Sequence, residues 1–327
     1  MRRALFLLTF LLLTPSIAHA TNEATQFPPI EAPLDPDAPN APDLAYGAYQ
    51  RGYFLNAFYE ATRRVESKKD PVAMVLLGIL YAEGLGVPQD LEKAASWYAV
   101  AAERGNFDAM FSLGMAKLKG VGVPKSEAEG VALLEKAAAS GHVAASYNLG
   151  LIALTPVNGQ TDDALAVRRF REAASAGNPD AQYSLAVLLK EGRGEPQDLG
   201  AAAALFVDAA KSGHVDAMVE AGIALFNGTG IAKDEKAAAD WFRKASERGS
   251  VLAMTRFARL LSAGVGIEAD PKGAAAWYFR AKEKGLSDPF LEDFVAKLPD
   301  DVRAAAQDEA SGVKASAVAA PAQAKTP

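Results

Sequence analysis

Residues 106–141 read NFDAMFSLGMAKLKGVGVPKSEAEGVALLEKAAASG, and this stretch decides the fold. It begins with a predicted helix over residues 107–119, because Ala109, Leu113 and Lys117 lie on one face at the i, i+4 and i+8 spacing. The run GVGVP that follows ends this helix, since glycine reaches positive φ at low cost and proline cannot continue a helix.

The second half of the stretch predicts another helix, which Ser126 caps and Gly141 ends. Leu134 and Ala137 face inward in this helix, and a small residue such as Gly114 lets the two helix axes approach closely. A pair of helices of this size cannot bury its apolar face alone, so it must stack on copies of itself.

The same pattern recurs at a step of 36 residues, and its repeated positions form independent columns. The closing glycines are Gly105, Gly141, Gly177, Gly213, Gly249 and Gly285. The alanines of the first helix are Ala73, Ala109, Ala145, Ala181, Ala217 and Ala253. The large residues of the second helix are Tyr98, Leu134, Phe170, Phe206, Phe242 and Tyr278. The second-helix caps are Asp90, Ser126, Asp162, Asp198, Asp234 and Asp270. These columns predict an all-α solenoid of six antiparallel helix hairpins over residues 70–285.

The segments around this array are expected to differ from it. Residues 43–69 predict a partial repeat that caps the N-terminal end, and residues 286–310 predict capping helices at the C-terminal end. Residues 21–42 hold six prolines and are typical of an extended linker. Residues 311–327 lack periodicity and are expected to form a disordered tail.

The first 20 residues predict a cleaved signal peptide. Arg2 and Arg3 precede an apolar run over residues 4–13, and the residues at 18–20 match a small-x-small cleavage pattern. An uncleaved anchor helix is the alternative, although the apolar run is short for a membrane span. No longer apolar run follows, so no span is expected in the mature chain.

The third repeat departs from the pattern, because its turn reads PVNG at residues 156–159 instead of carrying the pair of glycines. The 36-residue register holds on both sides, so the helix pair is expected to survive with an altered turn. Neutral drift, a local bend and a binding feature are all open interpretations of this turn.

The composition offers little for catalysis. Losing the two arginines of the signal changes the formal charge from -6 to -8, which disfavours nucleic acid as a partner. The chain has no cysteine, and His142 and His214 stand two repeats apart, directly after repeat glycines. We therefore expect a structural role for both histidines, no metal, no cofactor and no enzymatic activity.

The residues that carry the repeated pattern in the first half of a unit are Asp108-Ala109, Leu113-Gly114 and Gly120-Val121-Gly122-Val123-Pro124. Those of the second half are Ala94, Trp97-Tyr98, Ala101-Ala102 and Gly105. This pattern resembles the SEL-one-like repeat, a relative of the tetratricopeptide repeat. The resemblance covers about two thirds of the chain. It implies a tetratricopeptide-like, right-handed superhelical solenoid. The cysteine-rich branch of the family is excluded, since this chain has no cysteine.

The resemblance implies that the protein works by recognising another protein. The role expected from exported bacterial members is a periplasmic scaffold or adaptor that regulates an envelope sensor kinase or an envelope assembly complex. A secreted, virulence-type factor that contacts a host surface is the alternative, and an envelope hydrolase is the third hypothesis.

In the tetratricopeptide hairpin the first helix of each unit lines a concave groove, and the matching positions here are candidates for binding a protein partner. They are Phe111, Met115, Tyr147, Leu151, Tyr183, Val187, Lys190, Ile223, Phe226 and Arg259. An apolar middle and a polar end are expected, and contiguous exposed apolar surface marks binding sites. Packing between neighbouring first helices is the other interpretation of the two tyrosines.

Overall fold

The computed structural model describes residues 43–318, with side chains described up to Gly312. The predicted signal peptide and Pro-rich linker, residues 1–42, lie outside the described residues, as do residues 319–327. Apart from one isolated bridge in a turn, every regular element in the described range is a helix. The all-α prediction is therefore confirmed.

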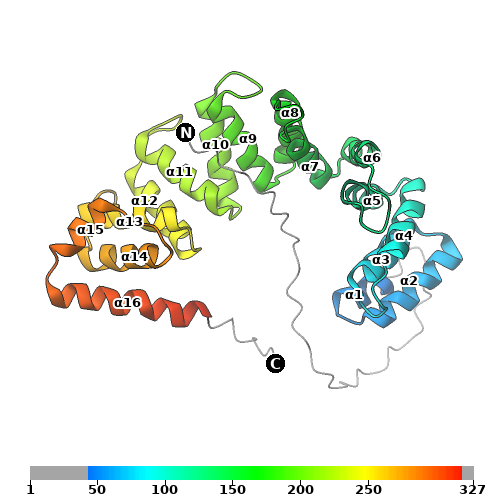
Figure 1. The fold of residues 1–327 in the computed structure, drawn as a ribbon, viewed down its shortest axis with the longest axis horizontal. Coiled ribbons are helices and arrows are strands. Elements are labelled where there is room, and N and C mark those ends of the chain that lie inside the picture. Colours follow the sequence, from blue (N-terminus) through cyan, green and yellow to red (C-terminus); the bar gives the residue numbers. More distant parts are fainter. Residues whose placement is uncertain (1–42, 319–327) are drawn as a thin grey trace. The chain divides into compact units, whose positions relative to one another are not determined.

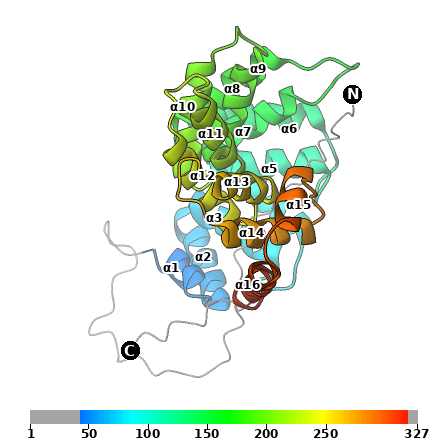
Figure 2. The same cartoon turned by 90° about the vertical axis from the view of Figure 1, so that its left-hand side faces the viewer.

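Successive helices form hairpins, and these pairs match the predicted repeats (Figure 1). The six pairs are α3 (Pro71–Glu83) with α4 (Leu91–Glu103), α5 (Phe107–Lys119) with α6 (Glu127–Ala139), α7 (Val143–Ala153) with α8 (Asp163–Ser175), α9 (Pro179–Glu191) with α10 (Leu199–Lys211), α11 (Val215–Asn227) with α12 (Glu235–Glu247), and α13 (Val251–Ala263) with α14 (Pro271–Glu283). Each pair packs on the pair before it in the sequence, as the view in Figure 2 also shows. The described residues thus form a helical repeat solenoid.

The helix boundaries follow from the predicted caps. In every second helix the side chain of the predicted cap accepts a hydrogen bond from a backbone N–H of the first turn, as Asp90 does from Lys93 N at 2.9 Å. Such a cap satisfies one of the orphan donors at a helix start and contributes about 1 kcal/mol. The cap residue's own backbone N–H bonds back to the first helix, for example Ser126 N to Lys117 O at 2.9 Å. These bonds close each hairpin.

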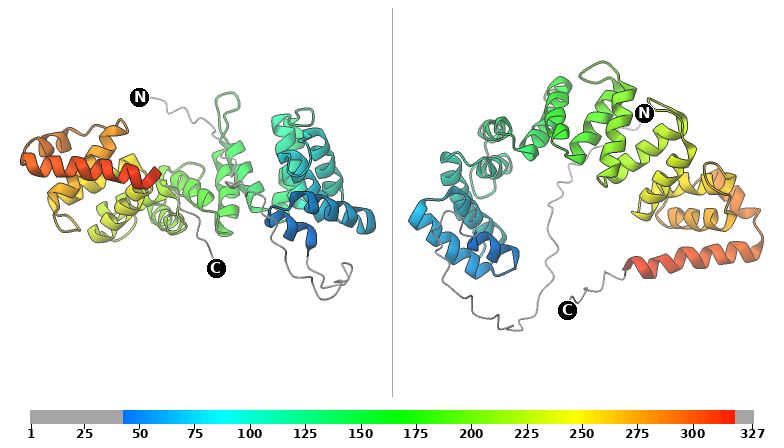
Figure 3. Two further views of the ribbon diagram at one scale, coloured as in Figure 1. Left: turned by 90° about the horizontal axis from the view of Figure 1, so that it is seen from below. Right: turned by 180° about the vertical axis from the view of Figure 1, so that it is seen from behind.

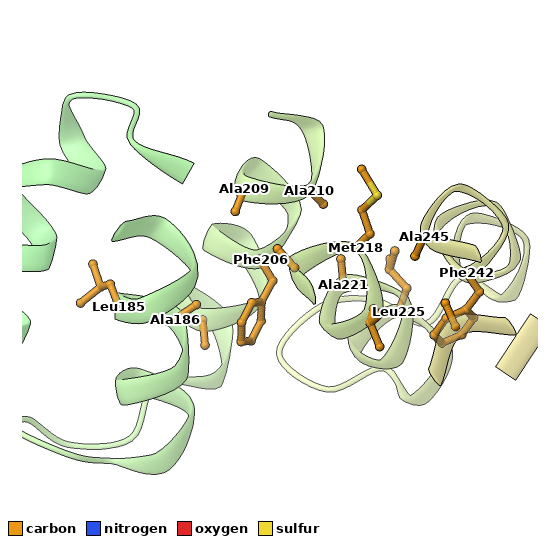
Figure 4. Packing of buried hydrophobic residues seen from close by; sticks show 14 of the residues in the cluster. Leu185, Ala186, Phe206, Ala209, Ala210, Met218, Ala221, Leu225, Phe242 and Ala245 are labelled. Carbon is orange, nitrogen blue, oxygen red and sulfur yellow. The ribbon is translucent and has the colours of Figure 1, made fainter. Parts of the chain in front are cut away.

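Inside a pair, a small residue on the first helix receives the large side chain of the second. A Cβ added at Gly150 would collide with the ring of Phe170, and one at Gly114 would press on Leu134. Alanine serves at the same position in the fourth pair, where Figure 4 shows the ring of Phe206 directed toward Ala186. The small residue is therefore needed for space rather than for backbone freedom.

Between pairs, the second glycine of the turn rests on the backbone of the preceding pair. A Cβ at Gly122 would collide with the carbonyl oxygen of Leu91, and one at Gly230 with the carbonyl oxygen of Leu199. Both glycines also have positive φ, +69° and +71°. The turn motif therefore has two functions, because it reverses the chain and forms part of the joint between neighbours.

The third pair keeps its hairpin but lacks the second glycine of the turn. Asp162 N still bonds to Ala153 O at 2.9 Å, so α7 and α8 close in the usual way. The turn itself is a two-residue hairpin in which Asn158 and Gly159 have φ of +52° and +82°. Asn158 occupies the position of Gly122, so the glycine that rests on the preceding pair elsewhere is missing here, and a Cβ at the neighbouring Gly159 would meet nothing within 4 Å.

The ends differ from the repeats. At the N-terminal end α1 (Leu44–Gln50) and α2 (Phe54–Lys68) form the partial pair. At the C-terminal end α15 (Pro289–Ala296) is short, and α16 (Asp300–Val318) packs beside α14, as Figure 3 shows. The helix α16 continues past Ala310 to Val318, whereas the sequence predicts a disordered segment from residue 311. Its Ala-rich sequence favours helix, which the lack of a periodic apolar pattern concealed.

Candidate protein-binding surface

The ten side chains predicted to line a groove lie on the first helices of five successive pairs. Phe111 and Met115 are on α5, Tyr147 and Leu151 on α7, Tyr183, Val187 and Lys190 on α9, Ile223 and Phe226 on α11, and Arg259 on α13. The eight apolar and aromatic members are half-buried, and the two cationic members are exposed. Each apolar member therefore packs on the protein and still presents part of its surface to solvent.

Two of the aromatic rings reach the next repeat. The ring of Phe111 stacks on His142 with centroids 4.6 Å apart, and the ring of Tyr183 stacks on His214 at 4.5 Å. Tyr183 also lies 5.8 Å from Phe206, which belongs to the second helix of its own pair. The ring of Tyr183 thus connects three helices, and both rings are held in place before any partner arrives.

The two histidines cap helices. His142 Nδ1 accepts a hydrogen bond from Ala145 N at 3.1 Å, and His214 Nδ1 accepts one from Ala217 N at the same distance. The other ring nitrogen, Nε2, lies 3.4 Å from Asp108 in the case of His142. The structural role predicted for both histidines is confirmed, and its nature is an N-cap that faces an aspartate of the preceding repeat.

The caps of the first helices form another column in the sequence. They are Asp70, Asn106, His142, Asn178, His214 and Ser250, again 36 residues apart. None of these six was predicted as a cap, because the columns of glycines, alanines and aromatics do not include this position. Asp, Asn and Ser are ordinary N-caps, and histidine replaces them here through its unprotonated nitrogen.

Burial controls the ionisation of the groups on this surface. It lowers the pKa of His142, while the carboxylate of Asp108 acts in the opposite direction. Burial, assisted by the negative charge of Asp180, raises the pKa of Tyr147. Burial, with the negative charge of Asp216 as the next largest cause, raises the pKa of Tyr183 to about 12. Both phenols therefore stay protonated at neutral pH and can donate hydrogen bonds.

The two cationic candidates already have partners inside the chain. Lys190 Nζ lies 2.6 Å from Glu220 Oε2 on the next first helix. Arg259 makes two hydrogen bonds of 2.8 Å to the carboxylate of Asp288, which caps α15. Both pairs link successive repeats, so these cations also act in the joints of the solenoid.

The described residues contain no cluster of three or more His, Asp or Glu side chains that could hold a metal ion. No helix in the same range is long and apolar enough to cross a membrane. What the surface offers is a succession of half-buried aromatic and aliphatic side chains, with phenolic donors and carboxylates beside them. Such a surface is suited to contact with another polypeptide.

The fold defines a class of protein, the helical repeat proteins in which each unit stacks on its neighbours. The family model of the Sel1 repeat matches residues 71–106, 107–142, 179–214, 215–250 and 251–286. These matches span more than half of the chain, which therefore belongs to the Sel1 repeat family. Sel1 repeat proteins act as protein-interaction scaffolds. The segment between residues 142 and 179, which holds the altered turn, is not matched, although it folds as a helix pair.

Solved structures agree with this assignment. The chain is 28% identical to a Sel1 repeat protein from Oxalobacter formigenes, with a TM-score of 0.61 over 76% of this chain and 100% of the other. It is 23% identical to c5321, a protective antigen of uropathogenic Escherichia coli with the same fold, with a TM-score of 0.51 over 87% of this chain and 72% of the other. No curated protein matches the sequence.

Proposed function

We propose that this protein is an exported scaffold that binds a segment of a partner protein along the exposed face of its first helices. The observation that carries the proposal is the row of half-buried rings on three successive first helices, Phe111, Tyr147 and Tyr183. Fixed aromatic side chains offer a large contact area at little entropic cost, which is why they dominate protein interfaces.

The proposed place of action is the periplasm. The positively charged, apolar start of the sequence and its cleavage pattern support export. The partner we propose there is an envelope sensor kinase or an envelope assembly complex, which the scaffold would regulate by binding. Fractionation of cells into cytoplasm, periplasm and medium tests this location, and recovery in the medium would favour the host-contact role instead.

Site-specific crosslinking tests the binding face. A photoreactive amino acid in place of Val187 should give a covalent adduct in the envelope that mass spectrometry identifies. The same amino acid in place of Ala204, which is exposed on the second helix α10, serves as the control and should not give that adduct. Equal yields from the two positions would count against the proposed face.

Replacing both Tyr147 and Tyr183 with alanine should weaken capture of the crosslinked partner about tenfold or more, because interface tyrosines often contribute 2 kcal/mol or more. Partner capture and the melting temperature are measured on the same preparation. A large fall in melting temperature would show instead that the rings serve mainly to pack one repeat on the next.

A further inference from the structure

A second surface lies on the opposite side of α5 from Phe111 and Met115. It is a hollow of about 430 Å³, formed between the helices of the first and second repeats. Its lining comes from Ala99 on α4, Leu113 and Lys117 on α5, Val123 in the turn, and Glu129, Ala132, Leu133 and Lys136 on α6. Leu113 and Lys117 are one helical turn apart, so they share a face that Phe111 and Met115 do not.

On the lining of this hollow, a small residue stands at a position where the other repeats carry larger ones. At the position of Ala99, the next five repeats have Glu135, Arg171, Val207, Arg243 and Phe279. Beside this alanine Leu133 and Val123 are partly exposed to an incoming side chain, and Leu113 is buried beneath them. The open floor is apolar, and it has room for more than one side chain of a partner.

A lysine on the same lining replaces a core residue. The residues equivalent to Lys117 in the last three repeats are Leu189, Leu225 and Leu261, all of them buried. The side chain of Lys117 is 22% exposed, and its ammonium lies 2.5 Å from Glu129 Oε2 at the edge of the hollow. This ion pair lowers the pKa of Glu129 and keeps its carboxylate charged.

A second lysine at the rim has no such partner. Lys136 is exposed on the last turn of α6, and no carboxylate pairs with it among the residues that the structure describes. Two lysines and one glutamate leave the rim with one positive charge in excess. The hollow therefore offers an apolar floor beside a cation that lacks a counter-ion.

We propose that this hollow is a docking site for a protein segment that inserts an aliphatic side chain next to an aspartate or glutamate. The aliphatic group covers Leu133 and Val123, and the acidic side chain pairs with Lys136. This site is separate from the face on which the proposed function rests, so the solenoid can hold two segments at once.

Selection of random peptides displayed on phage against the whole mature protein tests the site. We expect a group of peptides with an aliphatic residue adjacent to Asp or Glu. Ala99→Phe fills the hollow with the residue that the sixth repeat carries naturally at this position, Phe279, and should weaken these peptides about tenfold or more. Lys136→Glu should weaken them about tenfold, and replacing their acidic residue with the matching amide should do the same.

Two controls separate this site from others. Val207→Phe introduces the same side chain at the same position of the fourth repeat and should leave these peptides bound. The double alanine variant of Tyr147 and Tyr183 should also leave them bound, although it would release peptides that use the other face. Melting temperatures of the variants show whether each one folds.

The proposal is overturned if no selected peptide responds to Ala99→Phe in a folded variant, or if responding peptides carry no acidic residue and ignore Lys136→Glu. Peptides that respond only to the tyrosine substitutions would support the proposed function and reject this second site. Peptides that respond to Ala99→Phe and Lys136→Glu alone would support the second site and count against the first.

Discussion

At the scale of single residues, positions that depart from the repeat pattern affect the free energy of unfolding. Lys69 is one of them, because its φ is +55° and it stands where every later repeat has glycine. A residue with a side chain pays about 1 kcal/mol for this left-handed conformation. Glycine removes this strain, but it also increases the conformational entropy of the unfolded chain, which offsets part of the stabilisation. We expect Lys69→Gly to stabilise the protein by up to about 1 kcal/mol in urea unfolding. Lys69→Ala keeps the strain and should show no such gain.

His142 gives the stability of the protein a dependence on pH. Burial depresses its pKa in the folded state, so the folded protein binds its proton less readily than the unfolded chain does. The contribution of His142 to the free energy of unfolding is therefore complete above its pKa in the unfolded chain, near 6.5. It is lost as the pH falls through the pKa that His142 has in the folded state. His142→Asn keeps a capping oxygen, as Asn106 and Asn178 do in other repeats.

Urea unfolding of the wild type and of His142→Asn at several values between about pH 7 and pH 5 measures this effect. As the pH falls, the free energy of unfolding of the wild type should decrease relative to that of His142→Asn, because asparagine does not titrate. Parallel curves for both proteins would mean that His142 keeps its unfolded pKa in the folded state.

At the scale of an element, the turn between the two helices of a repeat is also a contact with the preceding repeat. Gly122 and Gly141 both have positive φ, but only a Cβ at Gly122 would collide with a neighbour, the backbone of Leu91. We expect Gly141→Ala to cost about 1 kcal/mol and Gly122→Ala more than about 3 kcal/mol in thermal or urea unfolding. Equal losses would mean that the joint between repeats does not depend on this close approach.

At the scale of the whole molecule, the third repeat should divide the array energetically. In a solenoid each unit is stabilised by its neighbours, and the turn of the third repeat lacks the glycine that rests on the unit before it. Trp97 lies before this joint, whereas Trp241 and Trp277 lie after it. Two variants are compared, one that keeps only Trp97 and one that keeps only Trp241 and Trp277. Their tryptophan fluorescence should report unfolding at different urea concentrations.

Replacing residues 156–161 with the sequence GVGVPK of residues 120–125 restores the missing contact. The two fluorescence transitions should then move together and the combined transition should steepen, because the slope grows with the surface exposed in one cooperative step. Coincident transitions already in the wild type would show that the other contacts across this joint suffice.

The sequence predicted the parts of this protein that repeat. Six copies of one pattern gave the helix pairs, their second-helix caps and the closing glycines, since a column of six agreeing residues averages out local ambiguity. The histidine caps escaped because their column mixes Asp, Asn, His and Ser, and the continuation of α16 to Val318 escaped because that segment lies outside the repeats. The hollow beside Lys117 escaped because it forms between the side chains of several helices, a feature that no column of the repeat records.

The binding face illustrates what a sequence of repeats leaves open. The half-buried rings of Tyr147 and Tyr183 contact their own second helices, at 5.7 and 5.8 Å from Phe170 and Phe206, and still reach solvent. The proposed recognition would use side chains that already pack, so sequence position alone does not separate the two roles. The tyrosine and crosslinking experiments do.

The glycine that rests on Leu91 contacts a backbone carbonyl oxygen, and its counterparts rest on the carbonyl oxygens of Leu199 and Glu235. Every residue type has that oxygen, so neighbouring units recognise each other at this point without reading a side chain. A substitution in the preceding unit therefore leaves this one contact in place, whereas the stacked rings and the ion pairs between units depend on their side chains. Exchange, duplication or deletion in steps of one whole repeat preserves the backbone contact at each new junction.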